Sequence, residues 1–363
     1  MLYKRFTRLL HHFTTEKLQA SSRPISLLYS FTKSFVAVNN YILAFLLLIP
    51  FSIPQSSLLP DSHREQMGDM AGAANIVFKS TDGGQTWQDI GKGLPENLKE
   101  NDIQRVFTND NGLYLRTGNG LYHNQPNSTS PFWKKEIFPD KQGSIAPGKA
   151  GMYAYNFDWQ SLRKVDSTRG WVPADTNFQW SLVRTVFETA GGTLFMASRE
   201  RLFRSTDNGK TWKLLFTGVG KIVESNGVLL GTGPKGILRS TDDGENWKWM
   251  LMEGGVGIDV EPIKGGFAAI TYSSASNTRR VRTSYDGGLT WQPIDAGLPA
   301  QLSITSIIQA GEDFFCGHPD GILKSSDQGK TWKLLLPSKD GKIFNLFVSG
   351  NVIYALSRTS RGC

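Results

Sequence analysis

The sequence has few cysteines and, after its first 60 residues, little net charge. Its 363 residues include two cysteines, Cys316 and Cys363, and two are too few for a zinc ribbon or a disulfide framework. Most of the net charge of +8 falls in residues 1–60, which hold six basic residues and one acidic residue. The other 34 basic and 31 acidic residues nearly balance. A nucleic-acid partner is therefore not expected, because phosphate binding needs a concentrated positive surface.

Motifs for metal, phosphate or nucleophilic chemistry are also missing. The five histidines have no metal-ligand spacing. The glycines fall at strand ends and form neither a phosphate loop nor a nucleophile elbow. We therefore predict no metal and no cofactor.

Only one long uncharged hydrophobic run is present. It extends from Phe35 to Ile53 and follows a basic, acid-poor stretch. This order predicts a basic n-region at 1–34 that stays cytoplasmic, a hydrophobic helix at 35–54 serving as signal peptide or transmembrane anchor, and a linker at 55–74. A later start at Met67 or Met70 and an organellar transit peptide remain alternatives. With a signal or an anchor, the rest of the chain is exported to the cell envelope, periplasmic or extracellular, and touches the membrane through 35–54 only.

One short motif recurs five times in the remaining sequence, and all five copies fit Ser-x-Asp-x-Gly-x-Thr/Asn-Trp. The fixed residues are Ser80, Asp82, Gly84 and Trp87; Ser205, Asp207, Gly209 and Trp212; Ser240, Asp242, Gly244 and Trp247; Ser284, Asp286, Gly288 and Trp291; and Ser325, Asp327, Gly329 and Trp332. We expect each Asp to accept hydrogen bonds from its own turn, each Gly to adopt a positive φ, and each Trp to pack between neighbouring sheets. These are structural roles.

The spacing of the motif predicts the fold. Trp133 and Trp171 end two decayed copies, which makes the steps between tryptophans 35 to 46 residues long. Each step suits four short strands with their turns, and the segments after Trp332 and before Trp87 together supply one more step. We therefore predict an all-β, seven-bladed β-propeller of four-stranded blades at 75–363. The ring is closed by N- and C-terminal strands that share one blade, which leaves no free sheet edge and favours a monomer.

These five copies resemble the Asp-box, or bacterial neuraminidase repeat (BNR), of a β-propeller superfamily. Its members include sialidases, two-propeller xyloglucan-type glycosidases, sortilin-type receptors and photosystem II stability/assembly factor-like proteins, and the resemblance covers residues 75–357. Single ring, short loops and export leader make the last group the most similar. The resemblance implies the fold, but it leaves the function open because propellers host many unrelated activities.

Two enzyme classes can be compared with the residues. Sialidases carry an Arg-Ile-Pro motif on their first strand, whereas the corresponding strand here begins Asn75-Ile76-Val77, and Ile or Lys cannot supply bidentate carboxylate recognition. A glycosidase needs two carboxylates facing each other across a cleft. Asp158 and Asp259 lie outside the Asp-boxes and are the candidates for such a pair, with turn and strand-end roles as the alternative.

The preferred hypothesis is a non-enzymatic, exported scaffold that binds a protein, or alternatively an extracellular glycan. In a propeller, the turns between second and third strands and the connections between blades lie opposite the Asp-boxes. Glu96 to Glu100 fall on one such connection. The candidate binding residues of that face are Arg116, Arg184, Arg199, Arg201, Lys235, His318 and Asp320. Exposed Arg and Trp are the residue types that dominate protein interfaces.

Overall fold

The computed structural model describes residues 73–136, 144–148, 151–156, 161–166, 170–173, 183–198, 201–216, 218–299 and 303–359. The predicted n-region, the hydrophobic helix at 35–54 and nearly all of the linker lie outside the described residues. Within those ranges, no helix has the length and apolar character needed to cross a membrane. The helical structure in them is one short 3-10 helix, η2 (Glu100–Asp102).

Six four-stranded antiparallel sheets each use four consecutive strands, and we number them as blades 1 to 6. Blade 1 holds β3 (Ile103–Asn109), β4 (Gly112–Thr117), β5 (Gly120–Asn124) and β6 (Lys134–Glu136). Blade 2 holds β7 (Ser144–Gly148), β8 (Gly151–Asn156), β9 (Ser161–Asp166) and β10 (Gly170–Pro173). Blade 3 holds β11 (Val183–Glu188), β12 (Leu194–Ser198), β13 (Leu202–Ser205) and β14 (Lys213–Phe216).

The other three consecutive sheets have the same plan. Blade 4 holds β15 (Ile222–Ser225), β16 (Val228–Gly233), β17 (Gly236–Ser240) and β18 (Lys248–Leu251). Blade 5 holds β19 (Gly257–Ile263), β20 (Gly266–Ser273), β21 (Thr278–Ser284) and β22 (Gln292–Pro293). Blade 6 holds β23 (Ser306–Ala310), β24 (Asp313–His318), β25 (Gly321–Ser325) and β26 (Lys333–Pro337).

One further four-stranded sheet, the shared blade, is built from both ends of the propeller sequence. It combines β27 (Lys342–Ser349) and β28 (Val352–Thr359) with β1 (Val77–Ser80) and β2 (Gln88–Asp89). β1 pairs antiparallel with β28, placing Val77 opposite Leu356 and Lys79 opposite Tyr354. The two ends of the propeller are therefore joined by strand hydrogen bonds.

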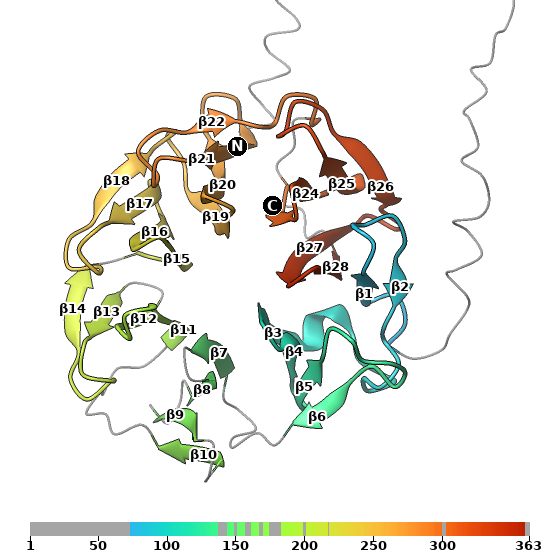
Figure 1. The fold of residues 1–363 in the computed structure, drawn as a ribbon, viewed down its shortest axis with the longest axis horizontal. Helices are drawn as coiled ribbons and strands as arrows, with labels where there is room; N and C mark the ends of the chain where they lie inside the picture. The colour runs from blue at the N-terminus through green and yellow to red at the C-terminus, as the bar shows by residue number, and fades with distance from the viewer. Residues whose placement is uncertain are drawn as a thin grey trace, which may run out of the picture. The chain divides into compact units, whose positions relative to one another are not determined.

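Contacts between successive blades close these sheets into a ring (Figure 1). β27 of the shared blade contacts β3, β3 contacts β7, β7 contacts β11, β19 contacts β23, and β23 contacts β27. Blades 3 and 4 meet through one hydrophobic cluster, and β15 and β16 contact β19. The first strand of each blade lies innermost and the fourth lies outermost (Figure 1). An all-β propeller of four-stranded blades is confirmed.

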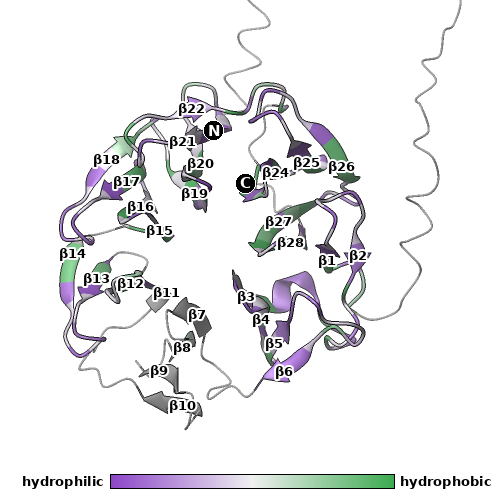
Figure 2. Cartoon of the chain, viewed as in Figure 1, coloured by the Kyte–Doolittle hydropathy of each residue, from purple (hydrophilic) through white to green (hydrophobic). Residues whose placement is uncertain are grey.

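The core lies in the seams between blades, because the inner strands of each sheet are covered on both faces. On β20, Ala268 and Ile270 pack toward blade 6, whereas Phe267 and Ala269 pack toward blade 4. Alternate residues of a strand point to opposite faces of its sheet, so such strands must be apolar at nearly every position. Outer strands such as β14 and β26 carry hydrophilic and hydrophobic residues side by side (Figure 2).

Candidate functional site

The blade topology gives the ring two different faces. In an antiparallel four-stranded meander, the turns after the first and third strands lie at one end of the sheet. The turn after the second strand and the connection to the next blade lie at the other end. We call these ends the Asp-box face and the connection face. All five Asp-boxes follow a third strand of their sheet, so they lie on the Asp-box face.

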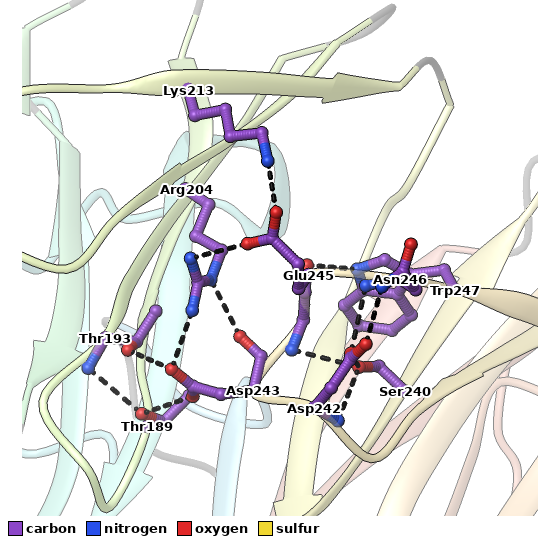
Figure 3. Close-up of polar contacts among 11 residues, drawn as sticks. Thr189, Thr193, Arg204, Lys213, Ser240, Asp242, Asp243, Glu245, Asn246 and Trp247 are labelled. Carbon is purple, nitrogen blue, oxygen red and sulfur yellow. Dashed lines mark hydrogen bonds and ion pairs between the residues drawn. The ribbon is translucent and has the colours of Figure 1, made fainter.

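Each Asp-box is a closed hydrogen-bonded turn, and Figure 3 shows the copy of blade 4. In the copy of blade 4, Ser240 Oγ donates to Asp242 Oδ1 at 2.7 Å and accepts from Gly244 N at 2.9 Å. Asp242 also accepts from the backbone and side-chain nitrogens of Asn246 at 2.9 and 2.8 Å. The same Ser-to-Asp and Gly-to-Ser bonds occur in the other four copies at 2.7 to 2.9 Å.

These bonds keep the Asp-box carboxylates ionised. Hydrogen bonds from the residue four positions further on lower the pKa of Asp207, Asp242, Asp286 and Asp327 to about 2. A carboxylate that accepts several N–H and O–H bonds is stabilised in its charged form. Such groups can serve as acceptors in a turn but not as proton donors near neutral pH.

The Gly and Trp of the box join one blade to the previous one. Gly244 has φ +79°, and a Cβ added there would lie 2.3 Å from Phe195 of blade 3. The ring of Trp247 meets the same Phe195 edge-on, with centroids 6.2 Å apart. Trp332 of blade 6 donates instead to the Ile294 carbonyl of the preceding blade at 2.9 Å. The box therefore shapes its own turn and also the seam behind it.

A basic residue just before the box Ser holds the Asp-box of the following blade. Arg204 Nε donates to the Asp243 carbonyl at 2.8 Å, and its guanidinium also pairs with the Asp243 and Glu245 carboxylates, both at 3.0 Å (Figure 3). Arg239 Nε donates to the Gly287 carbonyl at 2.6 Å, and Lys324 Nζ to the Gly83 carbonyl at 3.3 Å. We call these three residues seam donors; sequence analysis overlooked them, although a basic residue precedes the box Ser in four copies.

Two of the residues predicted for an exposed binding face need correction. Arg116 is fully buried, and its guanidinium donates to the carbonyls of Thr117 and Gly120 in its own turn. His318 is also fully buried. It accepts at Nδ1 from Asp320 N at 3.1 Å, so its proton lies on Nε2, which bonds the Pro299 carbonyl at 3.1 Å. Both side chains stabilise turns and are not available to a partner.

The other predicted binding residues are placed as follows. Lys235 and Asp320 are exposed on turns between second and third strands, and Arg201 lies half-buried just before β13. Arg184 lies on β11, and Arg199 lies outside the described residues. Lys235 and Asp320 therefore keep the accessibility that a contact residue needs.

The connection face carries a polar hollow of about 650 Å³ between the shared blade and blade 1. Its wall includes exposed residues of the connection before β3 and Asn119 from the turn between β4 and β5. The polar lining residues are Glu96, Asn97, Asn101, Asp102, Gln104, Thr117 and Asn119. Amide side chains offer both donors and acceptors, so this lining can bond backbone amides or sugar hydroxyls.

Glu100 anchors the connection that lines this hollow to strands β27 and β28. Its carboxylate accepts from Thr359 Oγ1 at 2.7 Å and from Ser357 Oγ at 3.2 Å, and it pairs with Lys342 Nζ at 2.9 Å. Although burial opposes ionisation, these bonds keep the pKa of Glu100 below its ordinary value. The connection that lines the hollow is thus anchored to β27 and β28, and the shared blade positions it.

A second hollow of about 470 Å³ lies on the same face between blades 5 and 6. Pro293, Leu298, Pro299 and Ile304 form its apolar part, and Arg279 and Arg280 form its basic part. The Arg280 guanidinium donates to both Asp295 carboxylate oxygens, at 2.6 and 3.1 Å. Arginine beside an apolar floor is a composition typical of protein interfaces.

The two catalytic candidates are not brought together among the described residues. Asp158 lies outside them. Asp259, on the innermost strand β19, pairs with Lys221 Nζ at 2.9 Å, and Glu261 on the same strand contacts the same nitrogen. Burial, with the nearby Asp259 charge, raises the pKa of Glu261 to about 7, although Lys221 opposes that shift. Sequence analysis missed Glu261 and Lys221 because their contact spans 40 residues and two blades.

The described residues contain one free thiol and no cluster of metal-ligating side chains. No group of three or more His, Cys, Asp or Glu side chains in it could hold a metal ion. Cys316 is a buried free thiol on β24, and burial raises its pKa to about 12. A thiol with that pKa stays protonated and is a poor nucleophile at neutral pH.

Comparison with known proteins agrees with the repeat and the fold. The model of the BNR/Asp-box repeat family matches residues 78–89 and 203–214. The chain is thus a β-propeller that carries BNR/Asp-box repeats. No curated protein sequence matches it.

Three solved structures illustrate the likeness. An ancestral GH74 enzyme matches at 14% identity and TM-score 0.51, over 71% of this chain but only 44% of its own. Virginiamycin B lyase from Staphylococcus aureus matches at 11% identity and TM-score 0.52, over 72% and 96% of the two chains. YCF48 bound to D1 peptide matches at 12% identity and TM-score 0.48, over 70% and 91%. At these identities the first two likenesses show the fold alone.

Proposed function

We propose that this chain is an exported, non-enzymatic β-propeller that binds a polypeptide partner through its connection face and acts as a scaffold. Seven blades, with both ends in the shared blade, would give that scaffold a closed ring. Export is supported by the order of the leader, in which a basic stretch precedes the uncharged run at 35–53.

The observation that carries this proposal is the position of the two hollows. Both lie on the connection face, at boundaries between blades. One offers amides and carboxylates, and the other offers arginines beside apolar side chains. An extended polypeptide has alternating amides and side chains, so it can use both kinds of surface.

The Asp-box face is less suited to a ligand through its repeated carboxylates. Each Asp-box Asp already accepts several bonds inside its turn. A partner would have to break those bonds and leave backbone N–H groups unpaired, which costs more than a new bond returns.

The test compares two double variants of the full chain. Asn97→Arg with Asn119→Arg adds two bulky charges to exposed residues of the polar hollow, and Gln85→Arg with Thr241→Arg adds the same charges to exposed Asp-box turns. Each immobilised protein is incubated with a cell-envelope extract. We expect wild type and the Asp-box variant to retain the same partner and the hollow variant to lose it. Loss only in the Asp-box variant would contradict the proposal.

A glycoside hydrolase is the second candidate, and one observation favours it. Asp259 and Glu261 contact one Lys221 nitrogen, so their carboxyl groups lie on the order of 5 Å apart, as in retaining glycosidases. A Glu with its pKa raised to about 7 can keep the proton that a general acid needs. Turnover of xyloglucan or a sialoside by wild type, lost in Asp259→Asn or Glu261→Gln, would replace the scaffold proposal. Inertness of wild type toward both would support it.

A further inference from the structure

The seam between the shared blade and blade 1 lacks the acceptor that the seam donors use elsewhere. Lys79 precedes the box Ser80 on β1, in the position that Arg239 and Lys324 hold in their blades. The following blade would have to supply a carbonyl from an Asp-box turn. Blade 1 has no Asp-box after β5, and Asn124 stands where the box Ser stands in other blades.

Lys79 consequently lies buried without a partner. Its exposed fraction is 6%, and burial is the cause that shifts the pKa of its amine, with no hydrogen-bond or charge partner among the described residues contributing. Val77, two residues earlier on the same face of β1, packs in a cluster with Leu113 and Leu115 of blade 1. The Lys79 side chain therefore leaves the shared blade on the side that faces blade 1.

Tyr354 lies beside Lys79, and its polar group also lacks a partner among the described residues. The two residues are directly opposite in the pairing of β1 with β28, so their side chains leave the same face of the sheet about 5 Å apart at Cβ. Tyr354 is fully buried, and its hydroxyl has no partner among the described residues. Burial lowers the pKa of Lys79 and raises that of Tyr354.

Blade 1 contributes an unpaired acceptor to the same seam. Asn124 is fully buried and donates through Nδ2 to Ser128 Oγ and the Phe132 carbonyl at 2.8 and 2.9 Å. Its Oδ1 has no partner within the described part of the chain. Tyr122, two residues earlier on β5, packs in the cluster that contains Val77 and Tyr354. Asn124 therefore faces the shared blade.

Unpaired buried polar atoms are rare because each loses its bonds to water without a replacement, and two of them, the Tyr354 hydroxyl and Asn124 Oδ1, beside the Lys79 amine at one seam indicate a missing group. Lys79 supplies a positive charge and Tyr354 a hydroxyl donor, whereas Asn124 Oδ1 can accept an N–H. A planar, singly charged acceptor matches the two donors, and an adjacent amide N–H matches the acceptor. A phosphate would leave more charge uncompensated, because one lysine is the cationic group here.

We propose that this seam is a carboxylate-binding site, in which Lys79 is the counterion and the Tyr354 hydroxyl donates a hydrogen bond. Lys79 directly precedes an Asp-box turn, so the site lies at the Asp-box end of the seam. An acidic side chain of a polypeptide or a small carboxylic acid carries the required group. This site is separate from the connection face and stands whether or not the proposed function holds.

The test follows the lysine side chains of the full chain by NMR after labelling with ¹³C-lysine. Sodium acetate is titrated at constant ionic strength against sodium chloride, and blocked aspartate and blocked asparagine amides form a second pair of probes. We expect the Lys79 Cε resonance to shift and saturate with acetate and with blocked aspartate, but not with chloride or blocked asparagine. Tighter binding of blocked aspartate than of acetate would indicate a polypeptide source, and equal binding a small acid.

Lys324 is the internal control, because it occupies the same position before its box but already pairs with Asp313 at 2.6 Å and donates to Gly83. Its resonance should not move. Tyr354→Phe should weaken acetate binding at least about five-fold, the worth of one hydrogen bond, without lowering the thermal midpoint. A wild-type Lys79 signal unmoved by acetate, or a Tyr354→Phe variant that binds acetate as tightly, would overturn the site.

Discussion

At the scale of single residues, the Asp-box uses the carboxylate of an acidic side chain to hold the backbone of its turn. Asp242 takes one bond from Ser240 and two from Asn246, and these bonds are strongest while the carboxylate is ionised. The pKa of Asp242 is about 2, against 3.8 for an ordinary aspartate. Protons therefore bind the unfolded chain more readily than the folded one over this range.

The first prediction is a loss of stability in acid. Because the folded pKa of these carboxyls is depressed, their contribution is complete above about pH 4 and is lost as pH falls toward 2. Urea unfolding at a series of pH values should give a free energy of unfolding that decreases over that interval. Asp242→Asn should cost about 1 kcal/mol at pH 7 and show a smaller acid loss. Equal pH slopes for both proteins would count against this account.

Burial of individual polar residues was the hardest feature to predict from sequence. The box positions follow from a repeat, so Gly244 at φ +79° and the acceptor role of Asp242 are predictable from one copy. Whether Arg116 or His318 points outward depends on carbonyls in its own turn or in another connection. The sequence of a turn that contains Arg or His does not show whether that side chain is buried or exposed.

At the scale of elements, the shared blade closes the ring. β1 has β28 on one side and the two-residue β2 on the other. Without β28, both β1 and β27 would expose unpaired strand edges, and closure would be lost. Sequence analysis predicts this sharing because the two end segments add up to one period, whereas the Glu100 bonds to Ser357 and Thr359 could not be predicted from spacing.

The second prediction concerns truncation of that strand. A chain ending at residue 351 lacks β28 and should lose its cooperative thermal unfolding transition, because Val77 and Tyr354 belong to one core cluster. A chain ending at residue 359 keeps β28 and serves as the control. Calorimetry of both chains makes the comparison. A sharp transition in the shorter chain, at the midpoint of the control, would show that β28 does not close the ring.

At the scale of the whole molecule, the ring of blades presents two chemically different faces. On the Asp-box face, the repeated polar groups form hydrogen bonds within the boxes and with the seam donors. The connection face has two hollows with unlike linings. The repeat predicts which face is which, because box turns follow third strands. It cannot predict the hollows, since their walls come from irregular connections such as residues 95–104, which differ from blade to blade.

The central claim is that a partner binds the connection face, and amide hydrogen exchange of the full chain with and without the recovered partner tests it most directly. We expect the partner to slow exchange at residues 95–104 and 117–119, at 276–280 and 293–299, or at both hollows. The five Asp-box turns should exchange as they do in the free protein. Protection confined to the Asp-box turns, with the connections unchanged, would contradict the account.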